Sequence, residues 1–145
     1  MRSSFLFIFL IIVVQASAQS YVLDKEQYLN SEEIARVDSL LSAYHKRTGN
    51  VVLMSTDSLD IKSSSYTSEI FKRYFPDTTS STRVLMLLMS RKNQFVKMVA
   101  SKPLMPHITQ QQMLEMIGAG APSLQAKRRE EGVTLILKKA METLD

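Results

Sequence analysis

The most constraining feature of the chain is the segment 83–90 (RVLMLLMS), which is almost entirely apolar through its middle. A β-strand with one solvated face alternates apolar and polar residues, whereas a strand covered on both faces reads as a continuous apolar run. The run is far shorter than the roughly 20 apolar residues that a membrane-spanning helix needs. We therefore expect a central strand at 83–90, in a sheet with a layer of structure on each face.

Two other segments have strand patterns. Residues 50–56 (NVVLMST) form a second, largely apolar run directly after Gly49, a residue that commonly ends helices. Residues 94–101 (QFVKMVAS) follow the central strand 83–90 after the short turn 91–93, and they alternate more between apolar and polar residues. This alternation and the short connection predict an antiparallel partner strand nearer the edge of the sheet.

Two helices are predicted before the central strand. The first begins at Asn30, which forms a capping-box pattern with Glu33, and it ends at Gly49. Its apolar face consists of Ile34, Val37, Leu40, Leu41 and Tyr44. A shorter helix is expected over 66–74, where apolar and aromatic residues recur at helical spacing, and Pro76 closes it.

Two more helices are predicted after the hairpin. Thr109 and Gln112 form a second capping box, which opens a helix with several apolar residues. The residues expected to end that helix are Gly118, Gly120 and Pro122. The last helix is expected over 128–144, with an apolar face of Val133, Ile136, Leu137, Ala140 and Leu144.

The order of these elements predicts the fold class. It is helix, strand, helix, strand, strand, helix, helix, and residues 19–29 read as a polar lead-in without an element of their own. A strand–helix–strand unit pairs its strands in parallel through a right-handed crossover, and the hairpin adds an antiparallel strand. We expect an α/β protein with a small mixed β-sheet flanked by helices on both faces.

Residues 1–18 have the pattern of a secretory signal peptide. Arg2 supplies the positive charge, 5–14 (FLFIFLIIVV) the apolar core, and 16–18 (ASA) the cleavage site. As a helix the apolar run would span only about half of a bilayer core, so a retained membrane anchor is the weaker interpretation. We expect an exported protein whose mature part, 19–145, is a single domain without a transmembrane anchor.

The composition narrows the class of protein further. Because the chain has no cysteine, disulfides, thiol catalysis and the lipid-modified cysteine of a bacterial lipoprotein are excluded. An exported chain without cysteine favours a bacterial periplasmic or secreted protein. The formal net charge is +4, but the basic cluster 127–129 is followed at once by two glutamates and has no aromatic residues beside it. No nucleic-acid partner is expected.

Three aspartates are the candidate metal ligands. Asp57 and Asp60 follow the strand 50–56, and Asp24 precedes a helix that runs antiparallel to that strand, so all three are expected at its carboxyl end. Open α/β sheets bind ligands at this end, and carboxylates suit calcium or another divalent cation. Ser55 and Thr56 could add oxygen ligands. The alternative is that these aspartates serve as loop and cap residues.

Other candidate groups do not converge. The hairpin places His107 at the opposite end of the sheet from Asp57, and His45 lies on the first helix, so both read as surface histidines. Lys102 and the pair Arg128 and Arg129 could hold a phosphate, although cations in such positions are more often simply solvated. No nucleophile elbow, phosphate-binding loop or zinc-protease motif is present.

Several of these segments together resemble the TPM domain family. They are 21–24 (YVLD), 29–33 (LNSEE), the helix end and strand 47–53 (RTGNVVL), and the strand 83–89 (RVLMLLM). Pro122 and Gly132 fall where that family has a proline and a glycine before its last helix, and the resemblance covers 21–144.

The resemblance implies an extracytoplasmic α/β domain. Relatives include acid phosphatases, calcium binders and accessory factors in the repair of photosystem II or the assembly of receptors. The family has a segment Val-Gly-x-Gly-Leu-Glu after its third strand and then an acidic residue, whereas 100–110 (ASKPLMPHITQ) lacks both glycines and both acids. The family's Gly-Asp-Tyr before the last helix is replaced by 127–132 (KRREEG).

These departures favour an exported accessory domain without catalysis, which binds a protein partner in the cell envelope. The alternative is a weak, divalent-cation-dependent acid phosphatase that uses Asp24, Asp57 and Asp60, with calcium or another divalent cation as its cofactor.

Overall fold

The computed structural model describes residues 20–58 and 82–145. The expected signal peptide, the expected helix at 66–74 and the candidate ligand Asp60 lie outside these residues. Within them the chain forms strands β1 (Val22–Asp24), β2 (Val51–Thr56), β3 (Val84–Ser90) and β4 (Phe95–Ala100). The helices are α1 (Ser31–Thr48), the 3₁₀ turn η1 (Met105–His107), α3 (Gln110–Gln125) and α4 (Arg129–Leu144).

The four strands form one mixed sheet in the order β1-β2-β3-β4. β1, β2 and β3 are parallel, and β4 pairs antiparallel with β3, as the hairpin predicts. β1 is an addition to the predicted order, in which 19–29 was a lead-in. Its three residues have no strand pattern of their own, and the parallel pairing of Asp24 with Thr56 in β2 recruits them into the sheet.

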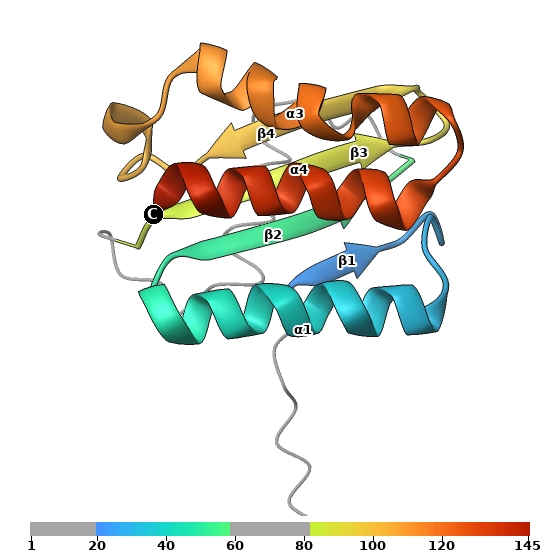
Figure 1. Cartoon of the computed structure of the whole chain (residues 1–145), viewed down its shortest axis with the longest axis horizontal. Coiled ribbons are helices and arrows are strands. Elements are labelled where there is room, and N and C mark those ends of the chain that lie inside the picture. The colour runs from blue at the N-terminus through green and yellow to red at the C-terminus, as the bar shows by residue number, and fades with distance from the viewer. Residues whose placement is uncertain (1–19, 59–81) are drawn as a thin grey trace, which may run out of the picture.

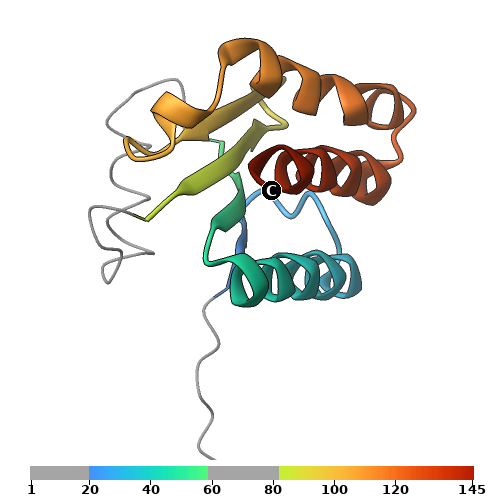
Figure 2. The ribbon, with the colours of Figure 1, turned by 60° about the vertical axis from the view of Figure 1, so that its left-hand side comes forward.

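The three described helices lie against the same face of the sheet, with α4 between α1 and α3 (Figures 1 and 2). Every residue of β2 and of β3 is buried, so the predicted central strand is confirmed. The mixed α/β fold is also confirmed, and apart from β1 and the short turn η1 the elements of the described residues follow the predicted order. The helix expected on the other face would be the segment 66–74, outside the described residues.

The predicted helix starts are confirmed. Asn30 and Glu33 form a reciprocal capping box at the start of α1, and Thr109 and Gln112 form one at the start of α3. Gly49 ends α1 in the left-handed conformation, with φ of 78°. Both signals depend on residues only a few positions apart, so the sequence alone shows them.

The predicted end of α3 is wrong. The helix continues through Pro122 to Gln125 instead of stopping near Gly118. A proline inside a helix leaves the carbonyl four residues earlier without a donor, and here that carbonyl belongs to Gly118, which is exposed to solvent. The buried Gly120 meanwhile packs against Gly132 of α4. Packing between the two helices therefore outweighs the local helix-breaking signals.

Candidate functional site

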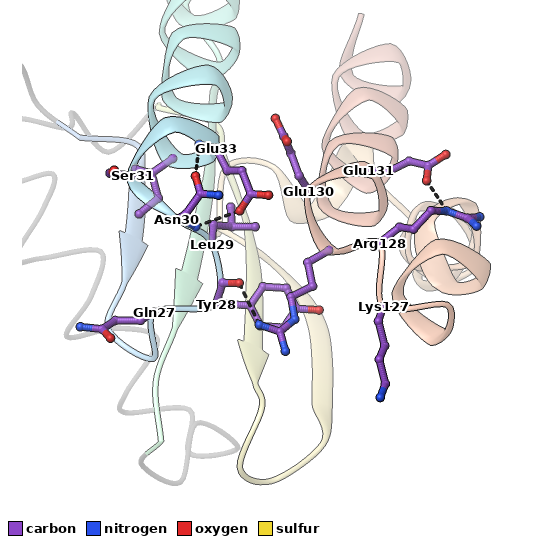
Figure 3. A pocket seen from close by; sticks show the side chains of 12 residues that line it. Gln27, Tyr28, Leu29, Asn30, Ser31, Glu33, Lys127, Arg128, Glu130 and Glu131 are labelled. Atoms are coloured by element: carbon purple, nitrogen blue, oxygen red, sulfur yellow. Dashed lines mark hydrogen bonds and ion pairs between the residues drawn. The ribbon is translucent and has the colours of Figure 1, made fainter.

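The carboxyl ends of β1, β2 and β3 meet at one edge of the sheet, because these strands are parallel. The loop 25–29 crosses this edge and leads into the first turn of α1, and the first turn of α4 lies close by (Figure 3). Two hollows open here, one between α1 and α4 and one between α3, the end of β3 and the start of β4. We treat this edge as the candidate functional site.

The carboxylate of Asp24 organises the loop at this edge. One oxygen accepts hydrogen bonds from the Thr56 hydroxyl at 2.6 Å and the Tyr28 amide at 2.9 Å. The other oxygen accepts from the Leu29 amide at 2.7 Å. The side chain thereby ties the end of β1 to β2 and bends the chain toward the cap of α1. Asp24 lies where the sequence placed it, and its contacts are those of a loop-forming residue.

Asp57 lies at the end of the neighbouring strand and is only 4% exposed. Its carboxylate forms an ion pair with Nζ of Lys25 at 3.0 Å, and its amide donates to the Met89 carbonyl. Among residues 20–58 and 82–145, no three histidine, aspartate or glutamate side chains are grouped so that they could hold a metal ion. The metal site of Asp24, Asp57 and Asp60 therefore stays a prediction, with two of its members at one edge.

The two suggested oxygen ligands, Thr56 and Ser55, differ in their hydrogen bonding. The Thr56 hydroxyl is used by Asp24, and it also accepts a hydrogen bond from the Glu26 amide at 3.1 Å. Ser55 is fully buried within β2, and its hydroxyl has no hydrogen-bond partner in the part of the chain that the structure describes.

The first hollow is an open cleft of about 950 Å³ between the starts of α1 and α4. Its charges are balanced by neighbours. Arg36 of α1 forms two hydrogen bonds with Glu130 of α4, at 2.6 and 2.9 Å, and Arg128 pairs with Glu131. The cleft thus brings two helix starts together through ion pairs, and it offers a ligand little net charge.

The second hollow, which we call the α3–β4 groove, has a volume of about 810 Å³. Its wall contains partly buried apolar side chains from α3 and β4, which are Phe95, Val96, Ile117, Ala121 and Leu124. Its rim carries the cations Arg91, Lys127 and Arg129. No aspartate or glutamate is among the described residues that line it. Unlike the cleft, the groove combines apolar surface with cations and has no acidic residue among its described lining residues.

Tyr28 stands between the two hollows and lines both. The guanidinium of Arg129 lies 5.0 Å from the centre of the Tyr28 ring and donates to the Tyr28 carbonyl at 3.4 Å. Burial raises the pKa of the Tyr28 hydroxyl, as does nearby Asp24, although Arg129 and Arg91 act in the opposite direction. The hydroxyl therefore stays protonated at neutral pH and can donate a hydrogen bond.

The turn that carries Arg91 is held by the same loop. The carboxylate of Glu26 accepts hydrogen bonds from the backbone amides of Arg91 at 2.9 Å and Lys92 at 3.2 Å. The Asn93 amide donates to the Ser90 hydroxyl at 3.1 Å. These contacts fix the backbone of the hairpin turn against the loop, and with it the point from which the Arg91 side chain extends.

The remaining candidate cations and histidines lie elsewhere or are engaged. His107 is near Arg83, at the opposite end of the sheet from Asp57, as expected. His45 is partly buried, and its Nδ1 is 2.7 Å from the Tyr21 hydroxyl, so its interpretation as a surface histidine is incomplete. Lys102 is exposed in the segment that follows β4.

Sequence reasoning misses the α3–β4 groove. Tyr28 falls in a segment without a predicted helix or strand. Arg91 falls in a predicted turn, where a solvent-exposed cation is common and indicates no site. The only available signal was the cluster 127–129, which we interpreted as a solvated helix end. The groove depends on bringing together a loop, a hairpin and the end of a helix that are far apart in sequence.

The pair Arg36 and Glu130 should make stability depend on acid pH. The hydrogen bond from Arg36 lowers the pKa of Glu130. A carboxylate whose folded pKa is lowered stabilises the protein above its unfolded pKa, and the contribution is lost as the pH falls through the folded pKa. We expect Glu130→Gln to reduce the loss of stability below about pH 4.3, the usual pKa of an unfolded glutamate. Urea unfolding at pH 7 and at pH 3 measures this.

The matched control for that experiment is Glu142→Gln, which removes an exposed carboxylate from the same helix. The effect at neutral pH should be small because the ion pair is largely solvent-exposed. If the two variants lose the same free energy of unfolding between pH 7 and pH 3, the Arg36–Glu130 ion pair is not a source of the pH dependence.

No helix in the described ranges is long and apolar enough to cross a membrane.

Comparisons with known proteins agree with this architecture. A family model described as "TPM domain" matches residues 22–143. The N-terminal domain of a protein from P. gingivalis has a TM-score of 0.72 at 14% identity, over 90% of this chain and 85% of that one. BA42 from the psychrophilic bacterium Bizionia argentinensis has a TM-score of 0.67 at 13% identity, over 83% of each chain.

A third solved structure has the same fold. The N-terminal domain of the cg2496 protein from Corynebacterium glutamicum has a TM-score of 0.63 at 10% identity, over 87% of this chain and 80% of that one. At such identities the likeness shows the fold alone. No curated protein matches the chain.

Proposed function

The chain belongs to the TPM domain family, and from this we propose that it is an exported accessory domain that binds a protein partner of the cell envelope and carries out no catalysis. The leader pattern at 1–18 supports export, and the absence of cysteine supports a bacterial periplasmic or secreted location.

The observation that carries the proposal is the α3–β4 groove, which has an apolar wall, cations on its rim and no acidic residue among its described lining residues. Apolar surface provides affinity, and a few polar or charged groups provide orientation, which is the usual composition of a binding site. The groove also lies at the carboxyl end of the parallel strands, where α/β folds commonly bind ligands.

The state of the carboxylates supports binding over catalysis. A metal-dependent phosphatase needs several carboxylates converging on a cation. Asp24 is already occupied by three hydrogen bonds and Asp57 by an ion pair with Lys25. A cation would have to displace these contacts. The segment 100–110 also lacks the acids that the family pattern carries.

The second candidate is a weak, divalent-cation-dependent acid phosphatase. One observation favours it, namely that Asp24 and Asp57 lie at the ends of neighbouring strands, as a shared cation site requires. Thermal unfolding of the leader-free protein with and without millimolar calcium, together with a phosphate-ester hydrolysis assay, separates the two functions. We expect neither a shift in melting temperature nor turnover.

Two results together would favour the phosphatase over the accessory function. They are turnover and a calcium-dependent rise in melting temperature that Asp57→Asn abolishes. A ligand that binds only the native state at about 100 times its dissociation constant adds about 2.7 kcal/mol, which is a shift of several degrees. At millimolar calcium this condition corresponds to a dissociation constant of about 10 μM, so the assay detects a site of that strength.

Partner binding is tested by site-specific photocrosslinking in the producing cell. A photoreactive residue at Gln125, which lines the groove and is exposed, should give a discrete adduct with an envelope protein. The matched position is Lys139, exposed on α4 away from the groove. Equal labelling at the two positions, or none at Gln125, would contradict the proposed function.

A further inference from the structure

We propose that the α3–β4 groove binds the C-terminal end of a partner polypeptide, with an apolar last side chain against the groove wall and the terminal carboxylate at the basic rim. This inference rests on the proposed function, since it names the chemistry by which the partner is recognised.

The charge of the groove selects an anionic ligand. Arg91, Lys127 and Arg129 line it, and none of its described lining residues is acidic. The neighbouring cleft shows the contrast, because Glu130 and Glu131 pair there with arginines. Lys127 makes no ion pair with any residue that the structure describes. A lining whose described residues include cations and no acidic residue is complementary to an anion brought by a partner.

One cation, Arg129, and the backbone of a second, Arg91, are held in place before any ligand binds. Arg129 is fixed by its contact with the Tyr28 ring and by its hydrogen bond to the Tyr28 carbonyl. The turn before β4 is fixed by Glu26, which positions the backbone of Arg91. Arg129 and Arg91 lie close enough to the Tyr28 hydroxyl to lower its pKa, although burial raises that pKa more. Preorganised donors lose less entropy on binding a carboxylate than flexible ones do.

The apolar wall requires an apolar group directly beside the anion. Val96 of β4 and Ile117 and Leu124 of α3 are each partly buried, so they offer apolar surface to a side chain placed in the groove. In a C-terminal residue the carboxylate and the side chain are attached to the same Cα. One residue can therefore reach the cationic rim and the apolar wall at once.

The polar groups of the groove favour a peptide over a lipid. Gln94 and Gln125 are also lining residues, and their exposed side chains can hydrogen-bond to a peptide backbone. An acyl chain would desolvate these groups without pairing them, which costs free energy. Capture of a terminal carboxylate by fixed donors is an established mode of peptide recognition.

The test uses dye-labelled peptides with a polar Gly-Ser body that end in leucine, valine, isoleucine, phenylalanine or methionine. Each is made with a free carboxylate and as the C-terminal amide, and binding to the leader-free protein is measured by fluorescence anisotropy. At least one free-carboxylate peptide should bind about tenfold or more tightly than its amide, since charge-assisted hydrogen bonds are lost in the amide. A control peptide ending in serine with a free carboxylate should bind weakly.

Arg91→Gln is the matched variant, and Lys92→Gln is its control. Both side chains are exposed in the same turn, and both backbone amides bond to Glu26, but only Arg91 lines the groove. Arg91→Gln should weaken the free-carboxylate peptide about tenfold and leave the amide unchanged, whereas Lys92→Gln should change neither. The comparison of acid with amide on the unmodified protein needs no variant.

Equal binding of acid and amide, or no binding of any peptide, would overturn the inference and leave the crosslink at Gln125 to decide the proposed function separately. Binding of phosphatidylglycerol vesicles that Arg91→Gln weakens, without peptide binding, would assign the groove to a lipid and overturn the inference as well. Peptide binding without a cellular crosslink would contradict only the proposed envelope partner.

Discussion

Asp24→Ala should lower the free energy of unfolding by about 3 kcal/mol. The substitution removes the acceptor for the Thr56 hydroxyl and for the amides of Tyr28 and Leu29. A hydrogen bond to a charged group contributes about 1.5–3 kcal/mol, and unpaired donors that remain partly buried cost more, although the three losses are not additive. Urea unfolding followed by circular dichroism measures the change.

The conservative variant Asp24→Asn should be less destabilising than Asp24→Ala. The side-chain oxygen of asparagine can still accept a hydrogen bond. Its NH₂ group can only donate, so it cannot pair with the amide or hydroxyl donors that Asp24 accepts from. Asp145→Ala, an exposed aspartate at the other end of the fold, serves as a control for the loss of a negative charge. If Asp24→Ala changes the unfolding free energy by less than about 0.5 kcal/mol, which is ordinary for a surface substitution, Asp24 does not organise the loop.

Gly120→Ala should lower the free energy of unfolding by about 2 kcal/mol, although alanine is the better helix former. A Cβ at this position would lie 2.2 Å from the Gly132 carbonyl oxygen and 2.6 Å from Cγ1 of Ile136. The first contact is with backbone, so α3 and α4 must move apart to relieve it. Overpacking of this kind costs about 1–3 kcal/mol.

Gly118→Ala is the matched control, two residues earlier in the same helix. A Cβ there meets no atom within 4 Å. Since both positions have helical backbone, Gly118→Ala should gain up to about 1 kcal/mol of helix propensity. Thermal unfolding should therefore shift in opposite directions for the two variants, by several degrees in total. A stabilising Gly120→Ala would show that the α3–α4 contact is not close.

The elements that were predictable are those whose signals are local. The continuous apolar runs of β2 and β3 match their complete burial, because side chains in a central strand meet apolar neighbours on both faces. The capping boxes at Asn30 and Thr109 follow from hydrogen bonds that span three residues. β1 was missed because three residues carry too little pattern, and only their pairing with β2 defines them as a strand.

The candidate site was predictable only in part. The positions of Asp24 and Asp57 at one edge follow from the parallel connection, so the sequence placed them well. Their hydrogen-bond partners did not follow, since Lys25 and Thr56 reach them only after the loop has closed. Their role as metal ligands together with Asp60 stays a prediction. The α3–β4 groove was absent from the sequence analysis altogether.

The sequence by itself determined the fold class, the central strands and the helix starts, because apolar periodicity and caps depend on neighbours along the chain. Only the tertiary structure decided that α3 continues through Pro122 and that α3 and α4 touch at Gly120. It also decided that Tyr28, Arg91 and Arg129 line one groove. These features join residues from 12 positions apart, for Gly120 and Gly132, to 101 positions apart, for Tyr28 and Arg129. Their free energies come from packing and charge between segments that have no shared local pattern.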